Sequence, residues 1–382
     1  MNCRHIWISC CVMMLSVGCG DDTVSSSSGG PEPDSGIEEG KDAQQPGDAA
    51  VSTVSLTLTE TVSVVDPNEY RSASFPRIFE DGAGGFHVFF HGVRAEWDGQ
   101  GPPTEYGDYA VVTLDAELKP SGETKVLTLS SKPGDFAMAK VGEDYFHLTG
   151  KAPGWLLAQF DSELNNVGEV AIEHTSSDRA NDMVLNYTDG HLYMMSLYGE
   201  NMSGSPEIVD PVYGHLFVYD TSLTEVQPAR VLSDVELLAW GGSILYRNDE
   251  FHLFTADGTH PTESNVLSVY HLDTNWNYLN ATKLADDGQW SQGVVYEQGV
   301  YYVAYHEGSH GTGDVVVAAF SESWEKLASV HVTSNGGQGN AFRPWLIKVG
   351  SRLYVSFDDV QFGNEQKPPV EAKVAIIETE TE

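Results

Sequence analysis

The sequence is poor in cysteine and in basic residues. Its cysteines all precede residue 20, at Cys3, Cys10, Cys11 and Cys19. The rest of the chain must therefore fold without disulfides, which a domain of this size can do on its apolar core alone. Lys and Arg together number 20 against 56 Asp and Glu, and the net charge of −36 disfavours nucleic acid and anionic lipid as partners. Because the acids are spread along the chain, we interpret them as adaptation to a saline habitat, with attraction of cations as the alternative.

Motifs of nucleotide and redox chemistry are also missing, since the chain has no Gly-rich phosphate loop, no G-x-S-x-G and no C-x-x-C. Residues 306–310 read H-E-G-S-H and match the zinc-protease pattern H-E-x-x-H. That chemistry needs a helix, whereas here the residues stand between two apolar runs beside several glycines. We predict no catalytic metal and no cofactor. His306, Glu307 and His310 are weak candidates for a metal site in a loop, and a divalent cation such as calcium is the ion that the acidic composition favours.

What the sequence has instead is a repeat. An apolar residue, a His or Tyr, and another apolar residue recur about every fifty residues. The copies are Phe86-His87-Val88, Phe146-His147-Leu148, Leu192-Tyr193-Met194, Phe251-His252-Leu253, Tyr301-Tyr302-Val303 and Leu353-Tyr354-Val355. We call the central His or Tyr the marker residue and expect it to be structural, with its ring packed and its polar tip satisfied. After each copy but the last, an Asp or Ser stands three residues before a Leu or Trp, as in Asp273 and Trp276, and this spacing predicts a turn.

Each copy, with one apolar run before it and two after it, predicts four consecutive strands. Four strands in about forty to fifty residues are typical of a β-propeller blade. We therefore predict an all-β fold, a six-bladed β-propeller over residues 51–382, with a β-sandwich or a solenoid as the alternatives. The last unit lacks its fourth strand, and Val54–Thr59 has no partner nearby, so this N-terminal strand is expected to close the ring. The turn pattern resembles a degraded Asp-box of sialidase-type propellers, without the Gly and the leading Ser of that motif.

The N-terminal residues predict where the protein is located. Residues 1–18 combine Arg4 with the apolar run Ile6–Val17, which is too short to span a bilayer and is typical of an export signal peptide. The small residues before Cys19 resemble a bacterial lipobox, with Leu15 one place further from the cysteine than usual. The resemblance implies that Cys19 is the lipidated, palmitate-bearing first residue of the mature protein. Residues 19–50 have almost no apolar side chains and are expected to be a disordered tether.

The chain thus resembles a bacterial outer-membrane lipoprotein with a sialidase- or glycosidase-like β-propeller domain. We expect a monomer that touches the membrane through its lipid only. Propellers bind ligands at the mouth of the central channel, which the loops after each second strand and the starts of the first strands surround. Aromatic and charged residues at these places suit a sugar or a peptide. The candidate ligand-binding residues are Arg77, Trp97, Asp182, Trp240, Trp290, His306, Arg343 and Asp358.

We interpret the protein as a binding or interaction module for a glycan or an envelope protein. The alternative is a propeller-type glycoside hydrolase or lyase, in which Asp182, Glu307 and Asp358 would supply the acid and the base or nucleophile. A sialidase-like site needs three converging arginines, and only Arg77 and Arg343 are suitably placed at strand starts, so binding is the favoured interpretation. A scaffold subunit of an envelope assembly is a third hypothesis.

Overall fold

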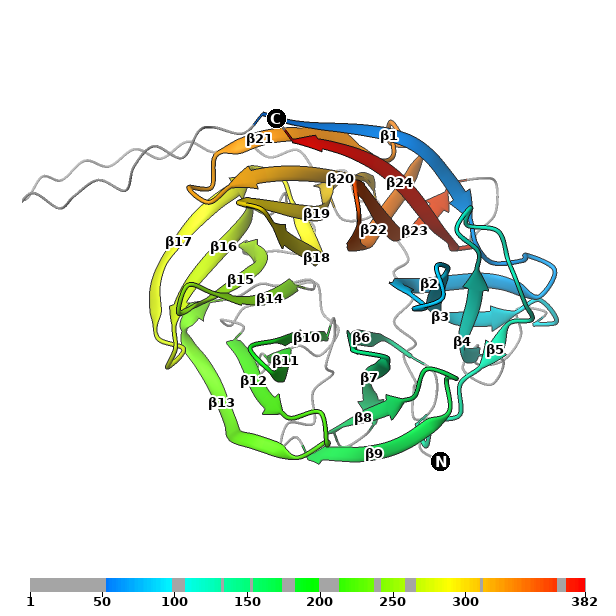
Figure 1. Ribbon diagram of the computed structural model, residues 1–382, viewed down its shortest axis with the longest axis horizontal. Helices are drawn as coiled ribbons and strands as arrows, with labels where there is room; N and C mark the ends of the chain where they lie inside the picture. Colours follow the sequence, from blue (N-terminus) through cyan, green and yellow to red (C-terminus); the bar gives the residue numbers. More distant parts are fainter. Residues whose placement is uncertain are drawn as a thin grey trace, which may run out of the picture. The chain divides into compact units, whose positions relative to one another are not determined.

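Six four-stranded antiparallel sheets make up the part of the chain that the structure describes. The computed structural model describes residues 53–97, 107–131, 134–151, 154–173, 183–198, 213–236, 242–257, 266–309, 312–362 and 369–381. Figure 1 shows the six sheets as blades around a central axis, with the first strand of each blade innermost. The predicted six-bladed propeller is confirmed, and the sandwich and solenoid alternatives are wrong.

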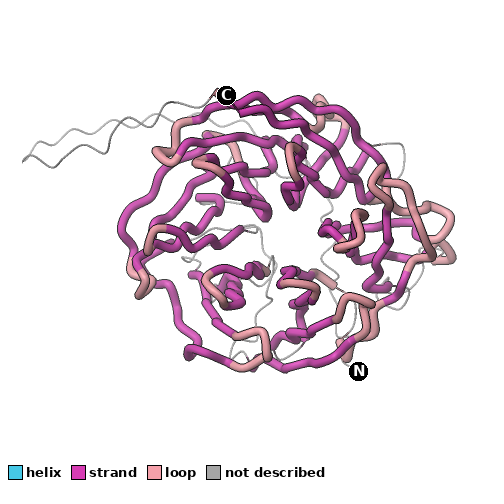
Figure 2. The backbone as a smooth tube through the Cα atoms, viewed as in Figure 1, coloured by secondary structure: helices cyan, strands magenta, loops and turns pink. Residues whose placement is uncertain are grey.

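The strands follow one another in the predicted order. Blades 1 to 3 consist of β2 (Tyr70–Glu80), β3 (Phe86–Arg94), β4 (Gly107–Leu114), β5 (Lys125–Val126), β6 (Phe136–Val141), β7 (Asp144–Lys151), β8 (Gly154–Phe160), β9 (Asn166–Glu173), β10 (Val184–Thr188), β11 (His191–Tyr198), β12 (Tyr213–Tyr219) and β13 (Glu225–Glu236). Blades 4 to 6 consist of β14 (Gly242–Arg247), β15 (Glu250–Asp257), β16 (Val266–Asp273), β17 (Tyr278–Ala285), β18 (Gln289–Glu297), β19 (Val300–Ser309), β20 (Thr312–Ser321), β21 (Lys326–His331), β22 (Gly339–Val349), β23 (Arg352–Gln361), β24 (Glu371–Thr381) and β1 (Val54–Ser63). Figure 2 shows strands and loops, and within the described ranges no helix is long and apolar enough to cross a bilayer.

The N-terminal strand completes the sixth blade, as predicted. β1 lies antiparallel to β24, and the blade has the order β1-β24-β23-β22 (Figure 1). The strand is longer than the predicted Val54–Thr59, because pairing resumes after a register shift next to Glu60 and continues to Ser63. The last blade therefore has no unpaired outer edge on β24.

The turns between the third and fourth strands have one geometry in five blades. At Asp273 the side-chain Oδ1 accepts the backbone N–H groups of Asn275 and Asn277, both at 2.8 Å. The Trp276 that follows adopts a left-handed backbone with a φ of 63°, and its side chain is buried against the blade. The equivalent residues with φ between 57° and 65° are Leu118, Leu164, Leu223, Trp276 and Trp324. The predicted turn is thus confirmed, because the acid satisfies the N–H groups that the reversal leaves unpaired.

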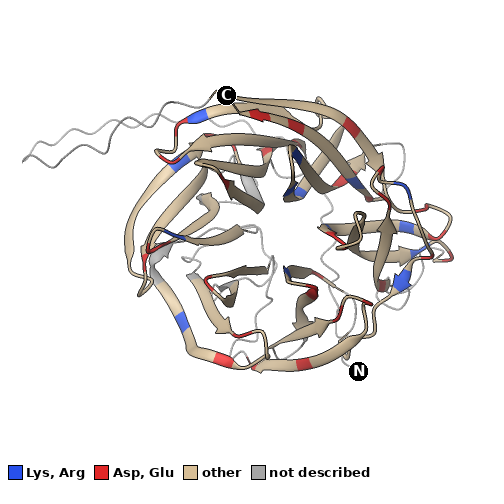
Figure 3. Ribbon diagram, in the orientation of Figure 1, with Lys and Arg blue, Asp and Glu red and all other residues tan. Residues whose placement is uncertain are grey.

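The core consists of six apolar clusters, each of which joins two neighbouring blades. The marker residues lie in these seams. His87 reaches the hydroxyl of Tyr145 in the next blade at 3.0 Å, as expected of a packed ring with a satisfied tip. His147 is different: it stacks on Phe136, neither ring nitrogen has a hydrogen-bond partner among the described residues, and burial lowers its pKa to about 3. Figure 3 shows the acidic residues distributed around the blades rather than gathered at one place.

Candidate functional site

Strands β2 and β22 carry the same irregularity at equivalent positions of the repeat. The pairing of β2 with β3 is interrupted after Ser74, and the pairing of β22 with β23 is interrupted after Phe342. At each interruption the residue before a proline has a left-handed backbone, with a φ of 58° at Phe75 and 53° at Arg343. A left-handed backbone is costly for residues with a Cβ, and such strain gathers at functional sites. The two bulges re-aim side chains on the innermost strands of blades 1 and 6.

Asp358 on β23 connects the two bulges. Its side chain is fully buried; Oδ1 accepts the backbone N–H of Phe75 at 2.7 Å, and Oδ2 accepts a hydrogen bond from Nη1 of Arg343 at 2.9 Å. Burial raises the pKa of Asp358 to about 6, while the charges of Arg343 and Arg77 and the bond from Phe75 act against that rise. At neutral pH this carboxyl group is therefore ionised and bound on both oxygens.

The Arg343 guanidinium lies between aromatic rings. Its central carbon is 3.8 Å from the ring centroid of Phe75 and 4.5 Å from that of Phe342. Its side chain is 21% exposed, and its Nε atom has no hydrogen-bond partner among the described residues. A cation over aromatic faces that still reaches solvent can bind an anion or a sugar hydroxyl.

Further hydrogen bonds cross between blades 6 and 1 at the same place. Arg77 donates from Nη1 to the carbonyl oxygen of Arg343 at 3.3 Å, and Ser356 donates to the carbonyl oxygen of Pro76 at 2.8 Å. Trp345 donates from its indole N–H to the carbonyl oxygen of Ile78 at 3.2 Å. These contacts, with the bonds of Asp358, define what we call the closure seam, and they hold the last blade to the first.

The charge of Arg343 also affects two further groups, His91 and Asp135, although the sequence did not single them out. Burial, followed by the positive charge of Arg343, lowers the pKa of His91 to about 4. Burial also raises the pKa of Asp135, and the charge of Arg343 opposes this rise. The repeat does hold a signal for His91, because His91, His306 and Asp358 each stand four residues after the marker residue of their blade.

Two of the expected loops are strands. Asp358 was placed in a loop, but β23 continues to Gln361 because its backbone pairs with β22 and β24 beyond the apolar run. His306 and Glu307 were also placed in a loop, whereas both lie in β19 and pair with β20. The first four residues of the H-E-x-x-H pattern, 306–309, are therefore on a strand rather than on the helix that the zinc-protease geometry needs.

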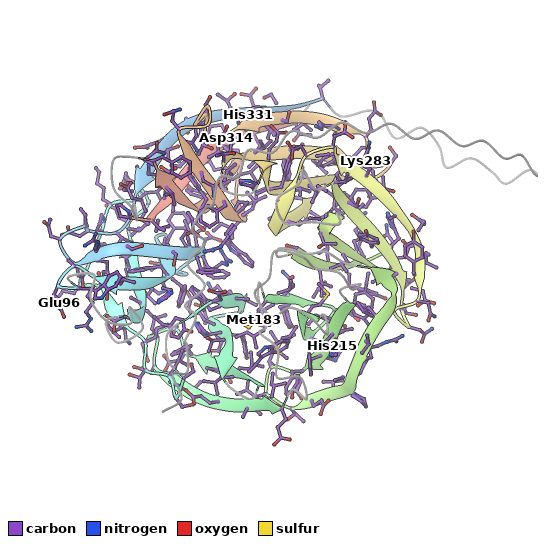
Figure 4. All side chains as sticks on the ribbon, turned by 180° about the vertical axis from the view of Figure 1, so that it is seen from behind. Glu96, Met183, His215, Lys283, Asp314 and His331 are labelled. Carbon is purple, nitrogen blue, oxygen red and sulfur yellow. The ribbon has the colours of Figure 1, made fainter. Side chains whose placement is uncertain are left out.

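His306 and Glu307 have separate partners. His306 is buried and donates from Nδ1 to the carbonyl oxygen of Ala341 at 2.7 Å. Glu307 lies 3.6 Å from Nε2 of the exposed His331, which Figure 4 labels on the rim of the ring. Since successive side chains of a strand point to opposite faces, one ion cannot bind both His306 and Glu307.

The structure thus brings together three predicted residues, Arg77, Arg343 and Asp358. Trp97 is partly buried just after β3, and its backbone N–H donates to the carbonyl oxygen of Arg94 at 3.2 Å. Trp290 belongs to β18, but its side chain is outside the described part of the chain. The predicted residues outside the described ranges are Cys19, Asp182, Trp240 and His310.

Comparison with known proteins finds similarity in structure only. No known protein family matches the sequence, and no curated protein matches it. A xylan beta-1,4-xylosidase from Bacillus halodurans is similar with a TM-score of 0.44 and 12% identity, over 65% of this chain and 52% of that one. A neuraminidase-like protein of A/flat-faced bat/Peru has a TM-score of 0.50 and 10% identity, over 84% of this chain and 94% of that one.

A member of the DUF4221 family from Bacteroides vulgatus is also similar, with a TM-score of 0.42 and 12% identity over 86% of this chain and 99% of that one. The chain spans about half the length of the xylosidase, of the GH43 protein BlXynB from Bacillus licheniformis and of GH43B from Bacteroides ovatus. At such low identity these likenesses show the propeller fold alone.

Proposed function

We propose that the propeller binds a glycan at the mouth of its channel, where blades 1 and 6 meet. The observation that carries this proposal is the partly exposed Arg343 guanidinium held between the rings of Phe75 and Phe342. Phe75 is buried, but the ring of Phe342 is half-buried and can pack against the apolar face of a sugar ring, while the fixed guanidinium donates to its hydroxyl or carboxylate groups.

The state of the described carboxylates favours binding over hydrolysis. Glycosidases need two carboxyl groups across a bond, one of them free to transfer a proton. Asp358 already accepts hydrogen bonds on both oxygens, and Glu307 contacts His331.

Glycoside hydrolysis is the second candidate because burial raises the pKa of Asp358 to about 6. A general acid that works near neutral pH needs such a raised pKa. If Asp358 were that acid, it would have to leave Arg343 during the reaction.

We further propose that the propeller is tethered to the outer membrane through a lipid on Cys19, and that it acts at the cell envelope as a monomer. The export-signal pattern of residues 1–18 and the polar composition of residues 19–50 support this proposal. Metabolic labelling with palmitate should mark the wild-type chain and leave the Cys19→Ala chain unlabelled.

The test of the glycan site is a panel of neutral and uronate-containing polysaccharides applied to the full chain. We measure both the protein retained on each polymer and the reducing ends released. Retention that falls at least about tenfold in Arg343→Gln, without release, supports binding, because one charge-assisted hydrogen bond is worth about 1.5–3 kcal/mol. Arg230→Gln, an exposed arginine on the outermost strand β13, is the matched control and should leave retention unchanged.

Release that disappears in Asp358→Asn or Glu307→Gln would make the protein a hydrolase and overturn the binding proposal. Absence of both retention and release would remove glycans as ligands and leave envelope proteins as the class to test.

A further inference from the structure

Blade 4 differs from the other blades at the position opposite the marker residue. In strand β16 this position holds His271, which pairs directly with the marker His252 of β15. The residues at the equivalent position of the other five blades are Thr113, Ala158, Val218, Ala319 and Ile376. A cross-strand pair of histidines therefore occurs in blade 4 and at no other marker position, and β15 also begins with a carboxylate, Glu250.

Glu250, His252 and His271 aim their ligand atoms at one another. Oε2 of Glu250 lies 3.3 Å from Nδ1 of His271 and 3.7 Å from Nε2 of His252. The three ligand atoms all lie within 4.8 Å of one another. Bonds of about 2.0–2.1 Å to a tetrahedral zinc ion place ligand atoms roughly 3.3 Å apart. The two Glu250 distances are close to this value, and the two imidazole nitrogens would approach each other on binding to complete three corners of a tetrahedron.

The surroundings of the cluster suit a metal ion. Both imidazoles are buried, whereas the Glu250 side chain is 40% exposed and leaves a way in from solvent. Nδ1 of His252 lies 3.4 Å from the hydroxyl of Tyr301 in blade 5, an outer partner of the kind that orients metal-bound histidines. Trp324 of blade 5 packs edge-on against both imidazole rings, with centroids 5.3 and 5.4 Å away.

The guanidinium of the nearby Arg247 has other partners. It is held by Glu322, and its central carbon lies 3.5 Å from the ring centroid of Tyr296.

We propose that Glu250, His252 and His271 form a site for a divalent transition-metal ion, and that zinc is the ion which two imidazoles and one carboxylate suit best. Bound to Nδ1 of His271 and to the Glu250 carboxylate, the ion would join β15 to β16. Calcium, which prefers six to eight oxygen ligands, does not fit two nitrogen ligands. The site lies at the start of β15, whereas Asp358 lies near the end of the equivalent strand β23, so it is independent of the glycan site.

The test is calorimetric titration of the full chain, produced without a histidine tag and freed of metal with a chelator, with zinc chloride. Millimolar calcium chloride is present throughout, because it occupies weak carboxylate sites on the acidic surface. We expect saturation at one zinc ion per chain. Cobalt(II) should give absorption bands of a low-symmetry site with nitrogen ligands.

Three substitutions remove one ligand each, and two of them introduce residues that other blades have at the same position. His271→Ala introduces the alanine that blades 2 and 5 have at this position, and His252→Tyr introduces the tyrosine that is the marker residue of blades 3, 5 and 6. Glu250→Gln keeps the shape of the side chain. Each should weaken zinc binding by more than the roughly 10–100-fold that loss of an outer partner costs. The matched control is His331→Gln, since Glu307 and His331 form an exposed acid–histidine contact of 3.6 Å with two ligands rather than three.

Equal affinity in wild type, His271→Ala and Glu250→Gln would overturn the proposal, as would the lack of any saturable binding in calcium. A loss confined to His331→Gln would also overturn it, because the ion would then bind at Glu307. If His271→Ala does not fold, Glu250→Gln decides the question, because Glu250 is partly exposed and its amide analogue packs in the same space.

Discussion

The closure seam between blades 6 and 1 and the seam between blades 4 and 5 both bury ionisable side chains among aromatic rings. In the closure seam the charges are already paired, because Asp358 binds both Arg343 and the backbone of Phe75. We call the second seam the histidine seam. There Glu250, His252 and His271 point their ligand atoms at one another, and no positively charged side chain of the described residues lies between them.

The two seams show two different roles for buried polar side chains. A buried ion pair whose oxygens and nitrogens are bonded holds two blades in register and penalises any change that removes one partner. Three metal-ligand atoms that converge at 4.8 Å or less leave a place that a cation would stabilise. The first seam is therefore the more sensitive to substitution, and the second is the more sensitive to added metal.

The largest effect is expected from Asp358→Ala. The change leaves the Arg343 guanidinium and the Phe75 N–H without their acceptor, and it should lower the free energy of unfolding by about 3 kcal/mol or more. Urea unfolding of the full chain at pH 7 measures it. Asp115→Ala, which removes an exposed turn acceptor in blade 1, is the control and should cost about 1 kcal/mol. Equal losses in the two variants would show that the closure seam contributes no more than a turn.

The contribution of Asp358 to the free energy of unfolding should also depend on pH. Burial raises the pKa of Asp358 to about 6 in the folded chain, above the usual value near 3.8 in the unfolded one. Between these values the folded state binds more protons, so the contribution of Asp358 to stability falls as the pH rises from 4 to 7, by about 2 kcal/mol. Asp358→Asn lacks this step. The difference in unfolding free energy between wild type and Asp358→Asn, measured at several pH values, should therefore change by that amount between pH 4 and 7. Parallel plots of unfolding free energy against pH for the two proteins would contradict the raised pKa.

A smaller effect is expected in the histidine seam from Trp324→Leu. Leucine occupies the equivalent turn position in blades 1 to 3, so the backbone tolerates the change, but the stacking of Trp324 on Tyr301 is lost. We expect a loss of about 2 kcal/mol in unfolding free energy and weaker zinc binding, because the imidazoles lose their packing. Trp276→Leu removes a comparable ring of blade 4 that stacks on Phe251, and it should lower stability while leaving zinc affinity unchanged.

Much of the fold could be predicted because all six blades carry the marker residue and five of them carry the turn spacing. The marker residues locate the second strands, and the Asp-to-Trp or Asp-to-Leu spacing locates the turns, as at Asp273 and Trp276. Both signals depend on residues near one another in sequence. The closing role of the N-terminal strand followed from counting strands, since Val54–Thr59 was the one apolar run without a partner.

The site was predicted less completely, because it depends on contacts between blades. Arg77 and Arg343 were expected at the mouth from their positions at strand starts, but the left-handed backbone at Phe75 has no signal in composition. His252 was interpreted as a packed ring, and the partner that changes this interpretation, His271, stands opposite it only because of the register between β15 and β16. Sequence spacing alone does not fix that register to one residue.

The pairing of β1 with β24 also affects when the protein can finish folding. The hydrogen bond from Thr59 to the carbonyl oxygen of Ile376 joins residues 317 positions apart. At roughly 5–20 residues per second, a ribosome adds this length in about 15–60 s, during which β1 waits without its neighbour. The four strands of each sheet in blades 1 to 5 are consecutive in the sequence, so these sheets can form before β24 is made. The strand that is made first is therefore paired last, and its exposed edge is the segment most open to pairing with another chain during synthesis.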